Sequence, residues 1–264
     1  MVRTKVVVGI DGSAGSSAAV RWAATEARMR QAELRVLIAR HRTDSFAFDA
    51  RAGDTPAEIH TAVQQARAIA PGLVVRGVAL PGYAVPVLLH AAEDAALVVL
   101  GSHGGRNFFG QAHGSVCSQV ATQARCCVVV VRGGSPDNGP VIVGVNDDPD
   151  AGTIIGRGFE EAALRDAPLV AVTAHENGSP RVTPDAEETL GAEIDLQLDP
   201  WREKYPRVRA TREVVGGHAD KVLVQRSREA QLVVAGARQQ GALLGPVGIR
   251  LLQRAECPVL IARG

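Results

Sequence analysis

Short apolar runs alternate along the whole chain with longer stretches whose apolar residues recur at helical spacing. In the first half, the apolar runs predict five strands: Lys5–Ile10, Leu34–Ala39, Val74–Ala79, Leu97–Leu100 and Cys127–Val131. Helical spacing predicts helices at about 16–31, 56–70, 83–95 and 115–123, the first of them capped by Ser16 or Ser17. This alternation indicates a parallel sheet that is covered by helices on both faces.

The second half of the chain repeats the first. With a shift of 135 residues, Val6–Asp11 aligns with Val141–Asn146; farther along, the shift is 131, and Gly114-Ser115 aligns with Gly245-Pro246. The repeat predicts five further strands: Val141–Val145, Leu169–Thr173, Arg209–Val214, Leu232–Ala235 and Val259–Ala262. We therefore expect two tandem five-stranded, doubly wound α/β domains, 1–134 and 139–264, joined by a linker rich in glycine and proline.

Composition and charge exclude several classes of protein. Apolar residues make up 46% of the 264 residues and aromatic residues only 3%, so the cores must consist of aliphatic side chains. A net charge of +1 gives no strong field to recruit nucleic acid or an anionic membrane. No apolar run is long enough to cross a membrane and no signal sequence is evident, so we expect a cytoplasmic protein.

The four cysteines, Cys117, Cys126, Cys127 and Cys257, form no C-x-x-C pair. Their spacing argues against a zinc site. We expect reduced and buried thiols.

A glycine-rich stretch follows the fourth predicted strand. It reads Gly101-Ser102-His103-Gly104, then nine further residues, then Gly114-Ser115 at the start of a helix. In open α/β sheets, ligands bind at the carboxyl ends of the strands. Glycines let the backbone approach a ligand closely, and the free N–H groups of a helix start attract anions. The stretch is therefore typical of a phosphate-binding loop.

Two better-known nucleotide motifs are absent from the sequence. No Gly-Lys-Ser/Thr occurs, and the first turn, Gly9-Ile10-Asp11-Gly12-Ser13, lacks G-x-G-x-x-G. Asp11 has two interpretations. Its carboxylate can hold a ribose hydroxyl, an adenine amino group or a metal on a phosphate, or it can cap its own turn.

These residues together resemble the universal stress protein family. The pattern G-x2-G-x9-G-[S/T] after an apolar fourth strand, the first strand ending in Val-Gly-Ile-Asp-Gly-Ser, and the final Cys-Pro-Val are typical of that family. The resemblance covers both halves and is closest to the tandem members of mycobacteria and related actinobacteria. It implies a Rossmann-like fold of the adenine nucleotide alpha-hydrolase type, with ATP across the carboxyl edge of the first sheet.

The resemblance also implies which residues bind the nucleotide. The base and ribose would meet Asp11 and the backbone of Gly9 and Ile10, and the chain near Arg40 would flank the adenine. The phosphates would be wrapped by Gly101, His103 and Gly104 and closed from the helix end by Gly114, Ser115 and Val116. The family more often has arginine at the position of His103, so phosphate affinity is expected to be lower here. Use of Mg²⁺ stays open.

The second half departs from this pattern. Asn146 replaces Asp11, Gln239 replaces Gly104, Pro246 replaces Ser115, and the loop is four residues shorter. We expect it to bind ATP far more weakly or not at all, although Arg238 leaves a smaller anion open. In the family, the fifth strands of two domains pair antiparallel, so the resemblance implies an intramolecular pseudo-dimer. Whether two chains form a homodimer is left open.

Three functions remain from the sequence. The first is an ATP-binding regulatory or stress-response protein; the alternatives are a slow ATP hydrolase and a nucleotide-independent scaffold that works through protein contacts. Enzyme marks of the broader fold group, Ser-Gly-Gly-x-Asp-Ser and His-x-Gly-His, do not occur. The sequence does not choose between ATP, ADP, AMP and a cyclic nucleotide.

Overall fold

The computed structural model describes residues 5–40, 56–102, 116–134, 138–146, 150–175, 183–237 and 244–263. The chain divides into two compact units, Met1–Val131 and Arg132–Gly264. Each is an α/β unit with a five-stranded parallel sheet, which confirms the expected fold class. The expected domain boundaries, 1–134 and 139–264, stay a prediction, as does the pairing of the two units.

The first unit has strand order β3-β2-β1-β4-β5, with neighbouring strands parallel. Its elements are β1 (Lys5–Gly9), α1 (Ala14–Met29), β2 (Glu33–Arg40), α2 (Ala57–Ile69), β3 (Val75–Pro81), α3 (Ala84–Ala91), β4 (Leu97–Gly101), α4 (Val116–Gln123) and β5 (Cys127–Val131). The order reverses between β1 and β4, the place where open α/β sheets bind ligands.

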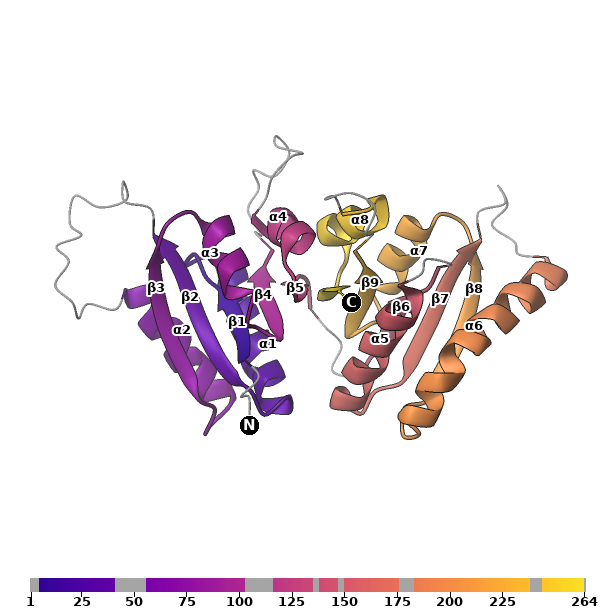
Figure 1. Ribbon diagram of the computed structural model, residues 1–264, viewed down its shortest axis with the longest axis horizontal. Coiled ribbons are helices and arrows are strands. Elements are labelled where there is room, and N and C mark those ends of the chain that lie inside the picture. The colour runs from indigo at the N-terminus through magenta and orange to yellow at the C-terminus, as the bar shows by residue number, and fades with distance from the viewer. Residues whose placement is uncertain are drawn as a thin grey trace. The chain divides into compact units, whose positions relative to one another are not determined.

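The second unit repeats this topology as β8-β7-β6-β9-β10. Its elements are β6 (Val141–Gly144), α5 (Ala151–Arg165), β7 (Leu169–His175), α6 (Pro184–Lys204), β8 (Ala210–Gly216), α7 (Ala219–Arg226), β9 (Leu232–Gly236), α8 (Pro246–Arg254) and β10 (Val259–Ala262). Figure 1 shows the labelled elements of both units.

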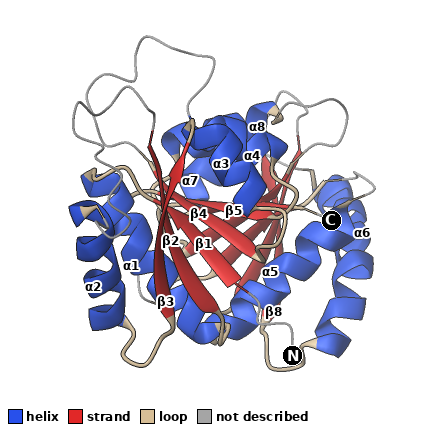
Figure 2. Ribbon diagram, turned by 60° about the vertical axis from the view of Figure 1, so that its left-hand side comes forward, coloured by secondary structure: helices blue, strands red, loops and turns tan. Residues whose placement is uncertain are grey.

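In each unit the strands lie between two helical layers (Figure 2). In the first unit, α1 packs on α2 and α3 on α4; in the second, α5 packs on α6 and α7 on α8. The central strands are fully buried, with Val6, Val7 and Val8 at 0% exposure in β1. A sheet covered on both faces needs continuous aliphatic strands, and the sequence supplies them with few aromatic residues.

The repeat extends to a buried ion pair in the first helix of each unit. Glu26 is 0% exposed and accepts from Arg30 Nε at 2.6 Å, and Glu161, 1% exposed, pairs with Arg165. The residues that follow the two arginines both have a left-handed backbone, with φ of 53° and 50°. The two units therefore use one design to end this helix and enter the second strand.

Three local predictions differ from the structure. Helix α1 begins at Ala14, because the Ser13 hydroxyl, not that of Ser16 or Ser17, accepts the capping N–H, from Ser16 at 3.1 Å. Helix α3 ends at Ala91, four residues before the expected end. The sequence predicts a helix at about 186–205 that Pro200 interrupts, whereas helix α6 runs unbroken through Pro200.

Cys127 and Cys257 are buried, and Cys117 and Cys126 are half-buried. Burial raises the pKa of the Cys257 thiol to about 12, so it stays protonated and unreactive at neutral pH. Among the described helices, none is long and apolar enough to cross a membrane.

Candidate functional site

The carboxyl ends of β2, β1 and β4 lie side by side in the first unit. Gly9 pairs with Leu37 of β2 and with the residue before Gly101 on β4. The Ile10 N–H continues this pairing past the strand end, since it donates to the Leu37 carbonyl at 2.9 Å. One edge of the sheet therefore carries Ile10 just after β1, Arg40 at the end of β2 and Gly101 at the end of β4.

Gly9 has a packing role. A Cβ there would lie 2.8 Å from the Leu100 side chain and 2.9 Å from that of Leu88. In the second unit, a Cβ on Gly144 would lie 2.8 Å from Leu223 in the same way. This glycine serves the fold of both units, and a nucleotide contact through its backbone stays a prediction.

Asp11 is exposed just past the end of β1 and shapes the turn that follows. Its Oδ1 accepts the Ser13 N–H at 2.9 Å, and Gly12 between them has φ +80°. The turn role considered for Asp11 is therefore present in the structure. The hydrogen bond from Ser13 also fixes the position of the Asp11 carboxylate at the edge of the sheet. A ligand-binding role for this carboxylate stays a prediction.

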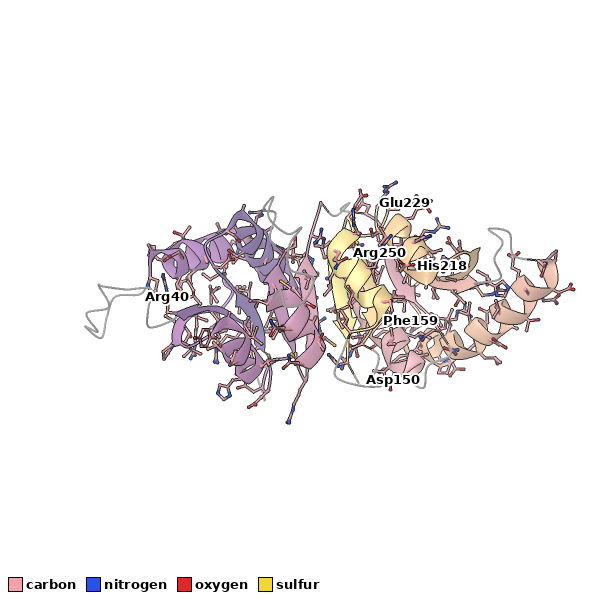
Figure 3. The ribbon with its side chains drawn as sticks, turned by 90° about the horizontal axis from the view of Figure 1, so that it is seen from above. Arg40, Asp150, Phe159, His218, Glu229 and Arg250 are labelled. Atoms are coloured by element: carbon pink, nitrogen blue, oxygen red, sulfur yellow. The ribbon has the colours of Figure 1, made fainter. Side chains whose placement is uncertain are left out.

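Arg40, which lies at the end of β2 (Figure 3), forms an ion pair that the sequence did not predict. Its Nη2 lies 2.9 Å from Glu58 Oε1 in the first turn of α2, and both side chains are about half-buried, with 37% and 40% exposure. A hydrogen bond from the Glu58 backbone lowers the pKa of the Glu58 carboxyl; burial opposes this and Arg40 adds to it. Glu58 follows Pro56 in the first turn of a predicted helix, a place where acidic residues are favoured, and this was the available signal.

The predicted phosphate loop begins at Gly101 and ends at α4. The Cys117 thiol donates to the Gly101 carbonyl at 3.4 Å, so the end of β4 and the first turn of α4 lie together. Val116 is the first residue of α4. Four predicted site residues, His103, Gly104, Gly114 and Ser115, lie outside the described residues.

The second unit has the same backbone at this edge with different side chains. The Gly217 N–H donates to the His175 carbonyl at 3.1 Å, as the Gly82 N–H does to Arg40 at 2.9 Å. His175 stands at the position of Arg40, and the exposed Asn146 replaces the aspartate. The geometry of the strands is thus conserved within the chain while its polar groups are changed.

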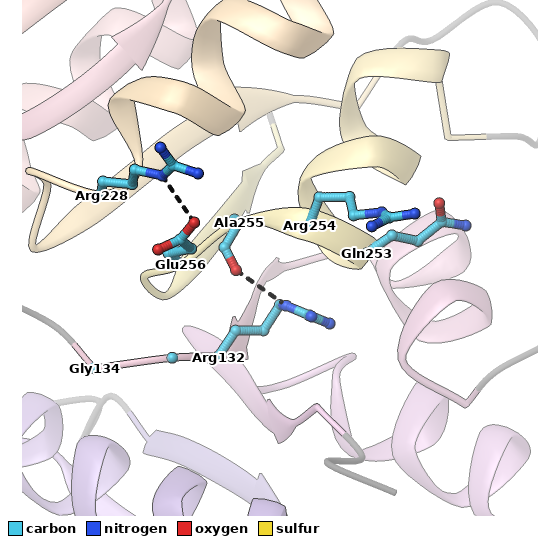
Figure 4. Close-up of a pocket in the computed structure, with 8 residues that line it drawn as sticks. Arg132, Gly134, Arg228, Gln253, Arg254, Ala255 and Glu256 are labelled. Carbon is cyan, nitrogen blue, oxygen red and sulfur yellow. Dashed lines mark hydrogen bonds and ion pairs between the residues drawn. The ribbon is translucent and has the colours of Figure 1, made fainter. Parts of the chain in front are cut away.

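The second unit also contains a cavity of about 480 Å³. It is lined by Arg132, Gly133, Gly134, Arg228, Gln253, Arg254, Ala255 and Glu256 (Figure 4). Arg132 donates to the carbonyls of Leu252 and Ala255 at 2.7 and 3.3 Å, and Arg228 pairs with Glu256 at 2.9 Å. Two of its three guanidinium groups thus already bind the protein itself. The cavity shares no residue with the predicted site, so we place the candidate site at the edge of the first unit.

In the described parts of the chain, no three His, Cys, Asp or Glu side chains are grouped so as to hold a metal ion.

The sequence matches the model of the universal stress protein family twice, over residues 3–132 and 138–263. A universal stress protein of Mycobacterium tuberculosis H37Rv is 32% identical over 286 residues, which cover 98% of this chain and 96% of the relative. The crystal structure of a universal stress protein from Archaeoglobus fulgidus has the same fold, with a TM-score of 0.72, 16% identity, and coverage of 98% and 96%.

A further structure from that archaeon is a universal stress protein in complex with dAMP. It is 22% identical, has a TM-score of 0.40, and covers 50% of this chain and 100% of its own. The nucleotide complex is a property of that protein. From the two family matches and the mycobacterial relative, this chain belongs to the universal stress protein family and carries two domains of that family in tandem.

Proposed function

We propose that this protein is an ATP-binding universal stress protein that acts as a nucleotide-dependent regulator in a stress response, with ATP held by the first unit. The proposal depends on one observation: Asp11, Arg40 and Gly101 lie at the carboxyl ends of three neighbouring parallel strands. Ligands of open α/β sheets bind at this edge. Gly101 also opens the glycine-rich stretch whose composition suits phosphate.

The adenosine half of ATP would lie over β1 and β2. The Asp11 carboxylate, fixed by its bond from Ser13, accepts a ribose hydroxyl, and the Ile10 backbone meets the base. The Arg40–Glu58 pair presents a donor and an acceptor side by side where the adenine would lie. These contacts orient the base and sugar before the phosphates are bound.

The triphosphate half would lie over the end of β4. There the loop glycines and His103 wrap the phosphates, and Ser115 and Val116 close them from the start of α4, where backbone N–H groups favour an anion. A Mg²⁺ ion would be held chiefly by the phosphates themselves, because it keeps several waters and needs few protein ligands.

The second unit would support the first without binding ATP. Asn146 lacks the charge of Asp11, and Pro246 has neither the hydroxyl nor the N–H of Ser115. A loop four residues shorter also leaves less backbone to surround three phosphates. The proposal thus expects one ATP per chain.

A regulator is favoured over a hydrolase because both carboxylates described at the edge are already engaged. Asp11 accepts from the Ser13 N–H and Glu58 pairs with Arg40. A general base must instead be within reach of the attacking water and able to take its proton. Release and binding of nucleotide, rather than turnover, would then carry the signal.

Isothermal titration of ATP into the full chain tests the proposal. We expect one site per chain, a loss of about 10- to 100-fold in affinity for Asp11→Ala, since a hydrogen bond to a charged group is lost, and no change for the matched Asn146→Ala. No binding by the wild type, or a loss with Asn146→Ala alone, would contradict it.

Two further measurements separate the alternatives. A phosphate-release assay with Ser115→Ala as control should show no turnover above that control; clear Ser115-dependent turnover would make the protein a hydrolase. A mass spectrum of the purified protein under native conditions should retain an adenine nucleotide, whereas a scaffold would carry none. The proposal also places the protein in the cytoplasm, which cell fractionation checks.

A further inference from the structure

The first turn of α1 touches the end of β4 backbone to backbone. A Cβ on Gly15 would lie 2.2 Å from the Ser102 carbonyl oxygen, and a Cβ on Gly101 would lie 2.2 Å from the Gly15 carbonyl oxygen and 2.7 Å from the Ser16 nitrogen. The opposing atoms are backbone atoms in both directions, so no side-chain rotation can relieve such an overlap. Only glycine fits at either position.

This contact joins two parts of the edge that are far apart in sequence. Gly15 belongs to the turn and helix that start with Asp11, whose carboxylate and the Ser13 cap hold the first turn together. Gly101 is the first residue of the glycine-rich loop, and its Ser102 neighbour donates to the Val131 carbonyl at 2.9 Å. The distance from the Asp11 turn to the loop start is therefore set by a rigid contact between fixed elements.

The second unit has no glycine at the position that matches Gly15. With the shift of 135 residues, Asp150 stands at the position of Gly15 and lies outside the helix, which begins at Ala151. A Cβ on Gly236, the counterpart of Gly101, would lie 2.3 Å from the Ile154 side chain, and no backbone atom of the described residues lies within 4 Å of it. Gly152, the second residue of α5 as Gly15 is of α1, has no atom within 4 Å of a Cβ.

We infer that Gly15 is a positioning residue that holds the adenosine-binding turn and the phosphate-binding loop of the first unit at the separation that one ATP molecule spans. The inference rests on the proposed function and adds to it how the two halves of the site are coupled. When two binding subsites are held at the right separation, a ligand that joins both parts gains affinity over either part alone. Gly15 acts through Gly101 and Ser102 and need not touch the nucleotide.

The consequence is a selective effect of Gly15→Ala. An added methyl group must push the α1 turn and the β4 end apart by on the order of 1 Å, because the atoms that it meets belong to the backbone and cannot rotate away as a side chain can. Adenosine contacts the turn only, so its affinity should stay within about twofold of the wild type, whereas ATP affinity should fall at least about tenfold. A variant that is merely less stable would lose both ligands alike.

The test is titration of adenosine and of ATP into the full-length wild type, Gly15→Ala, and two control variants. Gly152→Ala adds a methyl group to the second residue of α5, where no atom of the described residues lies within 4 Å. Gly77→Ala adds one 2.1 Å from the Ile59 side chain, away from the edge. Both controls should keep the wild-type ratio of the two dissociation constants, even though Gly77→Ala lowers stability.

The outcomes are distinct. The inference is supported if the dissociation constant of ATP rises relative to that of adenosine in Gly15→Ala alone. An unchanged ratio of the two dissociation constants, or an equal loss of affinity for both ligands, overturns it. No ATP binding by the wild type overturns the proposed function and the inference with it. Should Gly15→Ala not fold, hydrogen exchange on the wild type decides: ATP must slow exchange in 11–17 and 101–102 together, and protection of only one segment overturns the inference.

Discussion

In the first unit, helix α1 begins at Ala14, and its second residue, Gly15, packs against the end of β4. In the second unit, helix α5 begins at Ala151, and its second residue, Gly152, has no atom of the described residues within 4 Å of a Cβ built on it. The strands around the two helices pair in the same order. Two units with the same strand order therefore present different residues at this edge of the sheet. Substitution of a few residues where strands end changes the side chains that an edge presents without changing the fold.

The side chains at the two edges differ in the same sense. The first edge carries Asp11 and the Arg40–Glu58 pair, and the second carries Asn146 and His175 at the matching strand ends. Fixed charges that are held in place favour a charged, polar ligand. The second edge presents an asparagine and a histidine instead, which fits the supporting role proposed for this unit.

The largest expected effect tests what the units share. Glu26→Ala and Glu161→Ala each leave a half-buried or buried arginine without its carboxylate partner, so each should lower the free energy of unfolding by about 3–5 kcal/mol. Urea unfolding of the full chain measures both. Because the two ion pairs are equivalent, a cost below about 1 kcal/mol for one of them and the full cost for the other would break the claim of a common framework.

An intermediate effect tests where the units differ. Gly15→Ala should lower stability by about 1–3 kcal/mol, because it forces a methyl group against backbone. Gly152→Ala should raise stability by up to about 0.5–1 kcal/mol, because alanine loses less chain entropy in a helix and meets no neighbour. Thermal unfolding of both variants checks the signs. The same sign in both would remove the asymmetry.

The smallest effect concerns acid. The pKa of Glu58 is lowered in the folded protein, by its backbone hydrogen bond and by Arg40. The unfolded chain therefore binds the proton more readily, so this stabilisation is complete above the ordinary value of 4.5 and is lost as pH falls through the lower folded pKa. Since both partners are half-exposed, it amounts to less than about 1 kcal/mol and weakens with salt.

Glu58→Gln should therefore unfold slightly more easily than the wild type at pH 7, and the difference should vanish in acid. Urea midpoints between pH 7 and pH 3 measure it. Glu193→Gln is the control. Glu193 occupies the position of Glu58 in the second unit, where the residue at the position of Arg40 is His175, at the end of β7. A difference that grows as the pH falls would mean that folding raises the pKa of Glu58 instead of lowering it.

The fold could be predicted from the sequence because strand and helix patterns are local. The aliphatic run of Val6 to Val8 and its repeat at Val141 to Val143 identify buried parallel strands, and both are buried in the structure. The errors concerned helix ends and a proline inside a helix. Ser13 rather than Ser16 caps α1, and Pro200 lies within a helix, because caps and tolerated prolines depend on which backbone groups neighbouring residues satisfy.

The candidate site was only partly predictable. Asp11, Arg40 and Gly101 stand out by their place after predicted strands, and the structure brings those strand ends together. Glu58 and Gly15 did not stand out in the sequence, since Glu58 pairs with a residue of β2 and Gly15 packs against a backbone carbonyl just after β4. Neither partner is near in sequence.

The sequence by itself determined the repeat, the order of strands and helices, and the difference in polar residues between the two edges, because each is written in local spacing and composition. Only the tertiary structure decided that Gly15 meets Gly101 and that Glu58 meets Arg40. Such contacts form between segments that belong to different helices and strands. They follow from the distance at which a helix packs on a sheet, which no single stretch of sequence specifies.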